Sequence, residues 1–269
     1  MVTGSNAPIG VFDSGLGGLT VVRELIRQLP NESIVYFGDT ARVPYGPKGE
    51  ETIIRYSQDI ATFLRKQGVK AIVVACNTAT AHALPTLRAE QDVPVIGVIE
   101  PGARAAVAAS RDGRIGVIGT RGTIRSRAYD KAITALEPGA TVTAAACPLF
   151  VPLVEEGWLD SEPTRIVARG YLEPFTHGKI DTLVLGCTHY PLLKTVIGET
   201  IGRDVRLIDS AQETAAETGR VLREQGLQAT GSDARYRFVA SDDPEQFLAV
   251  GQRFLGAPLE RVELVTLGV

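Results

Sequence analysis

Residues 71–78 read Ala71-Ile72-Val73-Val74-Ala75-Cys76-Asn77-Thr78. The apolar part of this stretch is continuous rather than alternating, which is typical of a strand buried on both faces of a parallel sheet. The cysteine follows directly, so we expect Cys76 at the carboxyl end of the strand, where open α/β sheets bind their ligands. A lone cysteine in this place is most often a small buried core residue.

A second stretch repeats the pattern about half a chain later. Thr182-Leu183-Val184-Leu185-Gly186-Cys187-Thr188-His189 again runs from an apolar strand into a cysteine and a hydroxyl residue. Two cysteines in the same strand-end context are harder to explain as unrelated core residues. We therefore expect one site built from two similar halves, with one thiol from each half.

Strands and helices alternate around the first stretch. The predicted strands cover residues 9–12, 34–37, 71–74 and 93–98, and the predicted helices cover residues 19–28, 50–67 and 79–90. Apolar residues recur at helical spacing on one face of the first helix. Such alternation predicts an α/β fold with a parallel sheet.

The same pattern begins again in the second part of the chain. Ile115-Gly116-Val117-Ile118-Gly119-Thr120 resembles the start at residues 9–14, and residues 205–209 resemble residues 95–100. With the two cysteine stretches, these are three landmarks in the same order at nearly the same spacing. The sequence therefore predicts two pseudo-symmetric α/β halves.

The tail has no counterpart after the first half. It predicts a helix over residues 211–225, a strand over 236–240, a helix over 244–255 and a short edge strand within 262–265. We expect this tail to complete the first sheet. The predicted domains are residues 1–99 plus 210–269, which carry Cys76, and residues 100–209, which carry Cys187.

Composition excludes several classes of protein. The 269 residues carry a net charge of only -3, and 44% are apolar. Acidic and basic residues are interspersed, so no basic surface for nucleic acid is predicted, and no apolar run is long enough to span a membrane. Residues 1–8 lack the features of a signal peptide. Three cysteines without CxxC spacing predict reduced thiols in a cytoplasmic protein.

Two thiols facing one substrate suit a particular chemistry. A thiol has an ordinary pKa of about 8.5, which a helix N-terminus lowers. Both cysteines precede segments that start helices, so we expect both pKa values to be lowered. A thiolate on one side and a thiol on the other could remove a proton from carbon and return one from the opposite side, which is racemisation or epimerisation.

Other reactions fit the same residues less completely. A nucleophilic cysteine with His189 as its base would leave Cys76 without a role. Redox pairing lacks the CxxC signature, and no HExxH or paired CxxC motif predicts a metal site. A small-anion-binding module without catalysis also stays open, although the presence of both cysteines argues against it.

Several other motifs have ordinary interpretations. Gly15-Leu16-Gly17 after the first strand, with Asp39 further on, is similar to a dinucleotide-binding loop, but Thr20 stands where that fingerprint needs Gly or Ala. Asp13 would also repel a pyrophosphate. Cys147 is typical of a core residue, and Glu155-Glu156 are typical of a solvated pair at a helix start.

The motifs together resemble a known family. They are Phe12-Asp13-Ser14-Gly15-Leu16-Gly17-Gly18, Gly38-Asp39-Thr40-Ala41-Arg42-Val43-Pro44-Tyr45-Gly46, Ala75-Cys76-Asn77-Thr78-Ala79, Gly119-Thr120-Arg121-Gly122-Thr123, Pro152-Leu153-Val154-Glu155 and Gly186-Cys187-Thr188-His189-Tyr190-Pro191. In this order they are similar to the motifs of the glutamate racemases, within the aspartate/glutamate racemase family. The resemblance runs from about Ile9 to Ser210.

The resemblance implies a fold and an activity. The fold would be two α/β domains with the active site in the cleft between them. The activity would be cofactor-independent racemisation of L-glutamate to D-glutamate, supplying peptidoglycan synthesis and so cell-wall biogenesis and cell shape. No metal and no cofactor would be used, no nucleic acid or membrane would be bound, and the protein would form a homodimer.

The resemblance also implies roles for individual residues. Cys76 would take the α-proton from D-glutamate with the help of Asp13, and Cys187 would take it from L-glutamate with the help of His189. Glu155 matches a third acidic helper. The substrate-binding residues would be Asp13, Ser14, Tyr45, Gly46, Asn77, Thr78, Thr120, Thr188 and His189.

Overall fold

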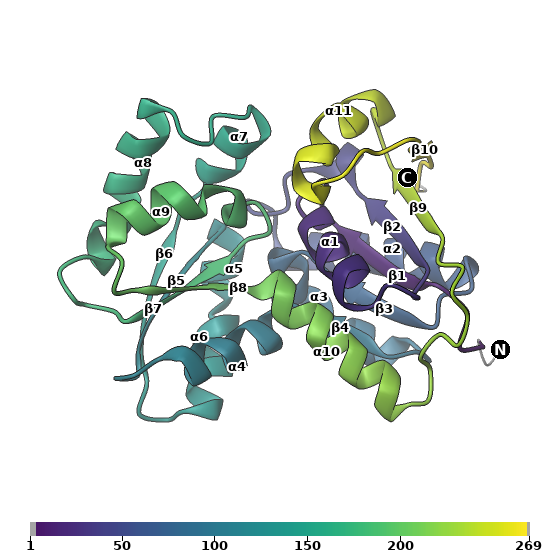
Figure 1. Ribbon diagram of the computed structural model, residues 1–269, viewed down its shortest axis with the longest axis horizontal. Coiled ribbons are helices and arrows are strands. Elements are labelled where there is room, and N and C mark those ends of the chain that lie inside the picture. The colour runs from purple at the N-terminus through teal and green to yellow at the C-terminus, as the bar shows by residue number, and fades with distance from the viewer. Residues whose placement is uncertain (1–3, 268–269) are drawn as a thin grey trace. The chain divides into compact units, whose positions relative to one another are not determined.

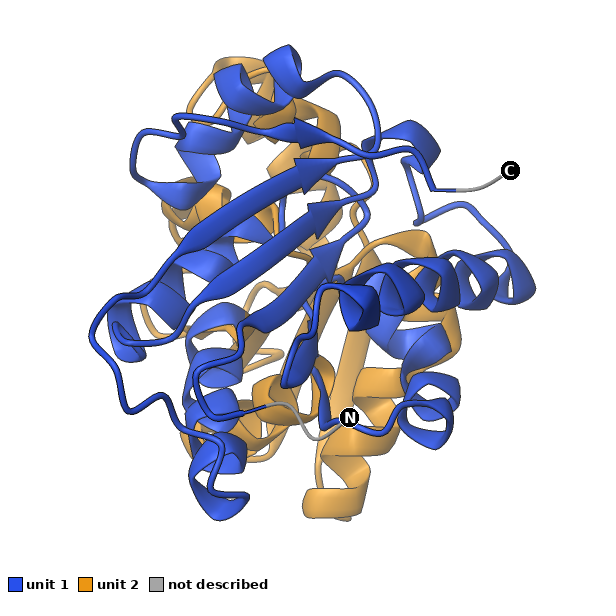
Figure 2. Cartoon of the chain, turned by 90° about the vertical axis from the view of Figure 1, so that its right-hand side faces the viewer, with its two compact units in different colours: residues 1–98, 211–269 blue, residues 99–210 orange. Residues whose placement is uncertain are grey.

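The computed structural model describes residues 4–267, and the chain divides into two compact units (Figure 2). Unit 1 comprises residues 1–98 and 211–269, and unit 2 comprises residues 99–210. Each unit contains its own parallel sheet, so the predicted α/β fold class with two parallel sheets is confirmed. The predicted domain boundaries, read as limits of independently folding domains, stay a prediction.

Unit 1 is built on six parallel strands in the order β10-β9-β2-β1-β3-β4 (Figure 1). The strands are β1 (Ile9–Asp13), β2 (Ile34–Gly38), β3 (Ala71–Val74), β4 (Val95–Gly97), β9 (Tyr236–Ala240) and β10 (Glu263–Leu264). The helices are α1 (Leu19–Gln28), α2 (Glu50–Lys66), α3 (Asn77–Glu90), α10 (Ser210–Glu224) and α11 (Pro244–Leu255), with a short 3-10 helix, η1 (Thr40–Arg42).

The central strands of unit 1 are apolar throughout because helices cover both faces of the sheet. Phe12 pairs in register with Phe37 and Val74, and this row joins the core that α2 and α3 close. Val11 pairs with Tyr36 in the neighbouring row, and the Tyr36 ring contacts Phe247 of α11. Each fully buried side chain of this size contributes about 1.5–3 kcal/mol, so both rows stabilise the sheet.

The tail completes this sheet, as predicted. Strand β9 pairs with β2 from Ile34 against Tyr236 to Gly38 against Ala240, and β10 forms the edge beyond it. Three segments distant in sequence therefore meet at the carboxyl end of β2 and β9. This end carries the loop that follows β2 and the residues after Ala240.

Unit 2 contains four parallel strands in the order β6-β5-β7-β8. The strands are β5 (Arg114–Gly119), β6 (Thr141–Ala146), β7 (Thr182–Gly186) and β8 (Arg206–Asp209). The helices are α4 (Ile99–Ala109), α5 (Arg121–Ser126), α6 (Ala128–Leu136), α7 (Phe150–Glu155), α8 (Glu162–Leu172) and α9 (Lys194–Ile201), with 3-10 helices η2 (Glu173–Phe175) and η3 (Tyr190–Leu193).

The order of strands in unit 2 repeats the order β2-β1-β3-β4 of unit 1. In both units the cysteine follows the third strand of the repeat, β3 or β7, and that strand lies beside the first strand, β1 or β5. The pseudo-repeat predicted from the sequence therefore extends to the topology. None of the helices within residues 4–267 has the length and apolar character that crossing a bilayer requires.

Candidate functional site

The first half of the candidate site lies at the carboxyl ends of β1 and β3. Since these strands are neighbours, Asp13 at the end of β1 and Ser14 after it lie close to Cys76 after β3. The Cys76 thiol donates to the Ser14 hydroxyl at 3.8 Å, and the Asp13 carboxylate accepts from the backbone N–H of Gly15 at 3.1 Å. Only 1% of Asp13 and 5% of Cys76 is exposed, so both groups are held away from bulk water.

Cys76 also caps a helix. Helix α3 begins at Asn77, two residues before its predicted start, and the Cys76 sulfur accepts from the backbone N–H of Ala79 at 3.4 Å. Asn77 and Thr78, two further predicted substrate contacts, form the first turn of α3 and are buried. The sequence therefore brings Cys76 and four other predicted site residues, Asp13, Ser14, Asn77 and Thr78, to neighbouring strand ends.

The expected lowering of the Cys76 pKa is wrong. Burial raises the pKa of this thiol, and the nearby charge of Asp13 raises it further. Hydrogen bonds from Ala79 and Ser14 act in the opposite direction but are outweighed. The N-terminus of α3 therefore does not compensate for the loss of water and for a neighbouring carboxylate, and Cys76 is a thiol at neutral pH.

The glycines of the loop after β1 serve close packing. A Cβ atom on Gly18 would lie 2.6 Å from the Asp13 Cβ and 2.9 Å from the Tyr36 hydroxyl oxygen. The Tyr36 hydroxyl in turn donates to the carbonyl oxygen of Gly15 at 2.8 Å. The absence of a side chain at Gly18 thus lets helix α1 begin directly against Asp13, which explains this glycine without a phosphate ligand.

The second half of the candidate site lies at the carboxyl ends of β5 and β7. Cys187, Thr188 and His189 follow β7 directly, and all three are buried. The Cys187 sulfur lies 3.9 Å from Nδ1 of His189, and the Thr188 hydroxyl oxygen lies 3.5 Å from the same nitrogen. Thr120 follows the neighbouring strand β5 and caps α5 by accepting from the backbone N–H of Thr123 at 3.2 Å.

Glu155 completes a chain of three side chains in unit 2. Its Oε1 lies 2.9 Å from Nε2 of His189, whose other ring nitrogen faces Cys187. Glu155 is the last residue of α7, so the prediction that Glu155 and Glu156 start a helix is wrong. The chain Glu155–His189–Cys187 resembles the arrangement in which a carboxylate orients an imidazole beside a thiol.

The charges around His189 favour a protonated imidazole. Burial alone would lower the pKa of His189, but its hydrogen bonds to Cys187 and Glu155 and their negative charges raise it to about 10. His189 is therefore an imidazolium at neutral pH. A cation 3.9 Å from the sulfur of Cys187 stabilises the thiolate form of a cysteine.

Cys147 lies near this half of the site although the sequence indicated only a core residue. It follows edge strand β6 and is fully buried, and its carbonyl oxygen accepts from the Tyr190 hydroxyl at 2.8 Å. Burial and the charge of Cys187 raise the Cys147 pKa to about 12, so it is a thiol. The core interpretation of this residue agrees with its burial.

Tyr45 and Gly46 lie in the loop after β2 in unit 1. The Tyr45 side chain is buried, with 1% exposed, whereas Gly46 is half-buried. The Tyr45 hydroxyl donates to the buried carboxylate of Asp39. Sequence reasoning considered Asp39 only as a ribose-binding acid and missed this contact, because the partner lies six residues away in an irregular loop.

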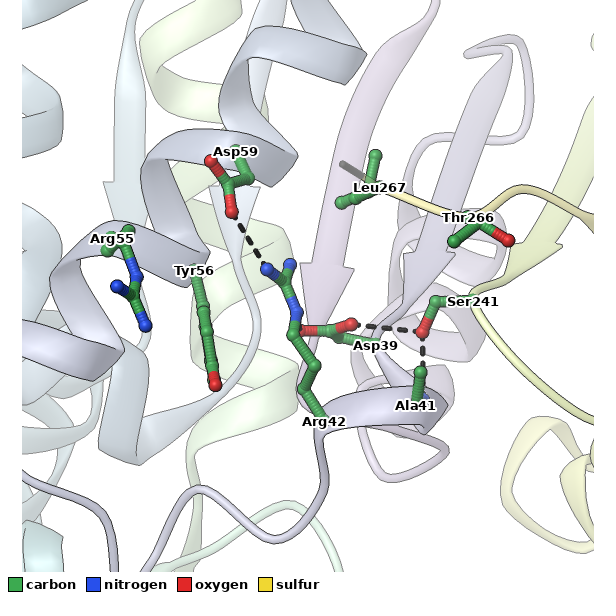
Figure 3. Close-up of a pocket in the computed structure, with 9 residues that line it drawn as sticks. All are labelled: Asp39, Ala41, Arg42, Arg55, Tyr56, Asp59, Ser241, Thr266 and Leu267. Atoms are coloured by element: carbon green, nitrogen blue, oxygen red, sulfur yellow. Dashed lines mark hydrogen bonds and ion pairs between the residues drawn. The ribbon is translucent and has the colours of Figure 1, made fainter. Parts of the chain in front are cut away.

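A pocket of about 660 Å³ opens beside this loop in unit 1 (Figure 3). Its lining residues are Asp39, Ala41, Arg42, Arg55, Tyr56, Asp59, Ser241, Thr266 and Leu267. The residues drawn in Figure 3 include none of the predicted catalytic or substrate-binding residues. Within residues 4–267, no three His, Cys, Asp or Glu side chains gather as ligands of a metal ion would.

Comparison with known proteins places these motifs in a family. Residues 9–218 match the family model described as Asp/Glu/Hydantoin racemase. A glutamate racemase from Geobacter metallireducens is 56% identical over 260 residues, which cover 96% of each chain.

Solved structures agree with this match. A crystal structure of glutamate racemase isoform RacE1 from Bacillus anthracis is 44% identical with a TM-score of 0.95, covering 98% of this chain and 99% of the other. Another, of glutamate racemase from Francisella tularensis in complex with D-glutamate, is 41% identical with a TM-score of 0.92, covering 98% of both chains. The similarity therefore extends over nearly the whole of both polypeptides.

Proposed function

Because the chain belongs to the Asp/Glu/Hydantoin racemase family, we propose that it interconverts L-glutamate and D-glutamate with two thiols and no cofactor. The observation that carries the proposal is the pair of buried cysteines, each after the equivalent strand of a repeated sheet topology. A relative of known structure binds D-glutamate, which supports this choice of substrate.

In the direction from L- to D-glutamate, Cys187 acts as the base. Its thiolate removes the α-proton, and the electron pair of the broken C–H bond is left on the α-carbon, delocalised into the adjacent carboxylate. The imidazolium of His189, 3.9 Å from this sulfur, stabilises the thiolate before the transfer. Glu155 holds the ring through its 2.9 Å contact with Nε2 and favours the charged form.

Cys76 acts as the acid in the same direction. Its thiol donates a proton to the opposite face of the α-carbon and becomes a thiolate, so protons and charge balance. Its raised pKa, caused by burial and by Asp13, keeps the proton in place until the carbanion forms. In the reverse direction the two cysteines exchange roles, and Asp13 assists Cys76 by receiving or returning a proton.

The remaining predicted residues would bind the substrate. Ser14, Asn77, Thr78, Thr120 and Thr188 present hydroxyl and amide groups at strand ends, where backbone N–H groups also suit carboxylates. Tyr45 and Gly46 would contact the substrate from the loop after β2. Uncharged donors of this kind bind carboxylates without adding cations that would compete for the two thiols.

The wider role follows from the reaction. We propose that the D-glutamate supplies peptidoglycan synthesis, and hence cell-wall biogenesis and cell shape. The three cysteines are free thiols in the structure, which suits a reducing compartment, so we place the enzyme in the cytoplasm. The homodimer implied by the resemblance stays a prediction, which light scattering of the purified protein tests.

The proposal is tested by following L-glutamate conversion in D2O without any added cofactor. Two thiols acting on opposite faces predict that early D-glutamate carries deuterium at the α-carbon while the remaining L-glutamate keeps its proton. Deuterium entering unconverted substrate as fast as product would indicate a single base. Binding of glutamate without turnover would instead support a binding module and contradict the proposal.

A further inference from the structure

Asp39 is a buried carboxylate that the proposed reaction does not use. It follows β2 directly, and its side chain has no exposed surface. Its Oδ2 accepts from Nε of Arg42 at 2.7 Å and from the Tyr45 hydroxyl, and its Oδ1 accepts from the Ser241 hydroxyl at 2.9 Å. A buried carboxylate needs such partners, and these three contacts pair both oxygens of Asp39.

Arg42 is fixed from several directions. Figure 3 shows its guanidinium between Asp39 and Asp59, with Nη1 of Arg42 lying 2.8 Å from Oδ2 of Asp59. The same guanidinium lies over the ring of Tyr56, 4.1 Å from its centroid. The Tyr56 ring is in turn 5.8 Å from the ring of Tyr45. Two carboxylates and an aromatic face thus immobilise the cation that neutralises Asp39.

These contacts decide which part of the loop around Tyr45 can meet a substrate. The whole residue, backbone included, is 1% exposed, and its hydroxyl already donates to Asp39. The side chain therefore points into the protein and anchors the loop. What the loop exposes next to Tyr45 is the backbone of the half-buried Gly46, which could meet a carboxylate.

We propose that Asp39 is a positioning residue of the reaction: held by Arg42 and Ser241, it fixes the Tyr45 hydroxyl and so sets the backbone of the adjacent Gly46 against a carboxylate of glutamate. The inference rests on the proposed function, since it needs the loop to bind substrate. Asp39 itself touches no reacting atom. Its loss should weaken substrate binding and leave the proton transfers at the two cysteines largely unchanged.

The first experiment is a double-mutant cycle with Asp39→Asn and Tyr45→Phe. Both are close in shape to the natural residue, and each removes one partner of the hydrogen bond. We expect each variant to raise KM for L-glutamate by roughly tenfold to a hundredfold, the scale of one hydrogen bond to a charged group, with kcat within a few-fold of wild type. Because both act through one contact, the double variant should show little further loss.

Arg65→Ala is the matched control. Arg65 also forms an ion pair in unit 1, with Asp92 at 2.5 Å, but belongs to the other end of α2 and to none of the contacts around Tyr45. It should leave KM near the wild-type value. Thermal unfolding of all variants separates a local change in the loop from a general loss of stability.

The second experiment uses the pocket beside Arg42. Arg42→Ala removes a guanidinium next to a space of about 660 Å³ that a small solute can enter. Millimolar methylguanidinium should therefore partly restore KM in Arg42→Ala, whereas it should not do so in Asp39→Asn, which lacks the carboxylate that receives it. A merely structural role of Arg42 would not give rescue that depends on Asp39.

The outcomes separate the two proposals. If wild-type protein racemises glutamate but the Asp39 and Tyr45 variants keep a normal KM, or their effects on KM are additive, the inference is wrong and the proposed function stands. A fall in kcat with unchanged KM would also contradict it. A wild-type protein without racemase activity would overturn the proposed function and this inference together.

Discussion

Replacing Glu155 by Gln should lower the pKa of His189. The carboxylate lies 2.9 Å from Nε2 of the buried ring and is among the groups that raise this pKa to about 10. A hydrogen bond to a charged group contributes about 1.5–3 kcal/mol, which corresponds to ~1–2 pKa units. Because 43% of the Glu155 side chain is exposed, solvent screening favours the lower end, and we expect a fall of ~1 unit.

The lower pKa of His189 should also change the activity at alkaline pH. In the proposed reaction, L-glutamate needs the imidazolium beside the Cys187 thiolate, so kcat/KM should fall as His189 loses its proton near pH 10. In Glu155→Gln this fall should begin ~1 pH unit lower, with little change near neutral pH, where the ring stays charged in both proteins. A coupled assay of D-glutamate formation across pH measures it.

NMR titration of the histidine rings measures the pKa of His189 independently of activity. The chain has only three histidines, so the resonance of His189 can be assigned by its loss in His189→Asn. Glu156→Gln is the matched control, because it removes the adjacent exposed carboxylate and leaves the Glu155 contact with the ring in place. An unchanged or raised His189 pKa in Glu155→Gln would refute the reasoning.

The free energy of unfolding should also fall in Glu155→Gln. A histidine whose pKa is raised in the folded state stabilises the protein fully below its ordinary value of 6.5, and this contribution is lost as pH rises through about 10. Glu155→Gln should therefore reduce the free energy of unfolding by ~1.4 kcal/mol near pH 6, and by less above pH 10. Urea denaturation at the two pH values tests this.

Three further predictions follow. Cys76→Ala and Cys187→Ala should each stop racemisation, and serine should fail too because its hydroxyl is a far weaker acid; near-normal turnover would refute the two-base mechanism. The ratio of kcat/KM for glutamate to that for aspartate should be at least roughly a hundredfold, because a shorter side chain leaves its donors unpaired; comparable rates would contradict the substrate assignment. Gly18→Ala should destabilise the fold by about 1–3 kcal/mol, since its Cβ would meet Asp13 at 2.6 Å, whereas Gly49→Ala, in open space, should not.

Much of the fold could be predicted because the informative patterns are local. Apolar spacing places α1 at Leu19–Gln28 and α11 at Pro244–Leu255, and the observed bounds are the same. Continuous apolar runs identify β1 and β3 because helices bury both faces of the sheet. Strand β6 gave no comparable signal, since Thr141–Ala146 is an edge strand of small, half-exposed residues whose pattern resembles that of a loop.

The site was predictable in part for the same reason. His189 lies two residues from Cys187, so their contact could be expected from the sequence. The contact of Glu155 with the same ring joins residues 34 positions apart and was not predicted, since the resemblance to a family indicated only that Glu155 is an acidic helper. The raised pKa of Cys76 was missed because a helix N-terminus is visible in sequence, whereas the extent of burial and the distance to Asp13 are not.

The surroundings of the two cysteines differ in a way that bears on the proposed two-base reaction. Burial and Asp13 raise the pKa of Cys76 and keep it protonated near neutral pH, whereas the sulfur of Cys187 lies 3.9 Å from the imidazolium of His189. In the proposed roles this resting state accepts L-glutamate, because Cys187 is the base for that enantiomer. After one turnover Cys187 is the thiol and Cys76 is the thiolate. The Cys76 thiolate then lies beside the Asp13 carboxylate, and two neighbouring negative charges are the less favourable arrangement. The enzyme that has just released D-glutamate should therefore return to its resting form by exchanging protons with water, and this step should be faster than the uptake of D-glutamate at low substrate concentration.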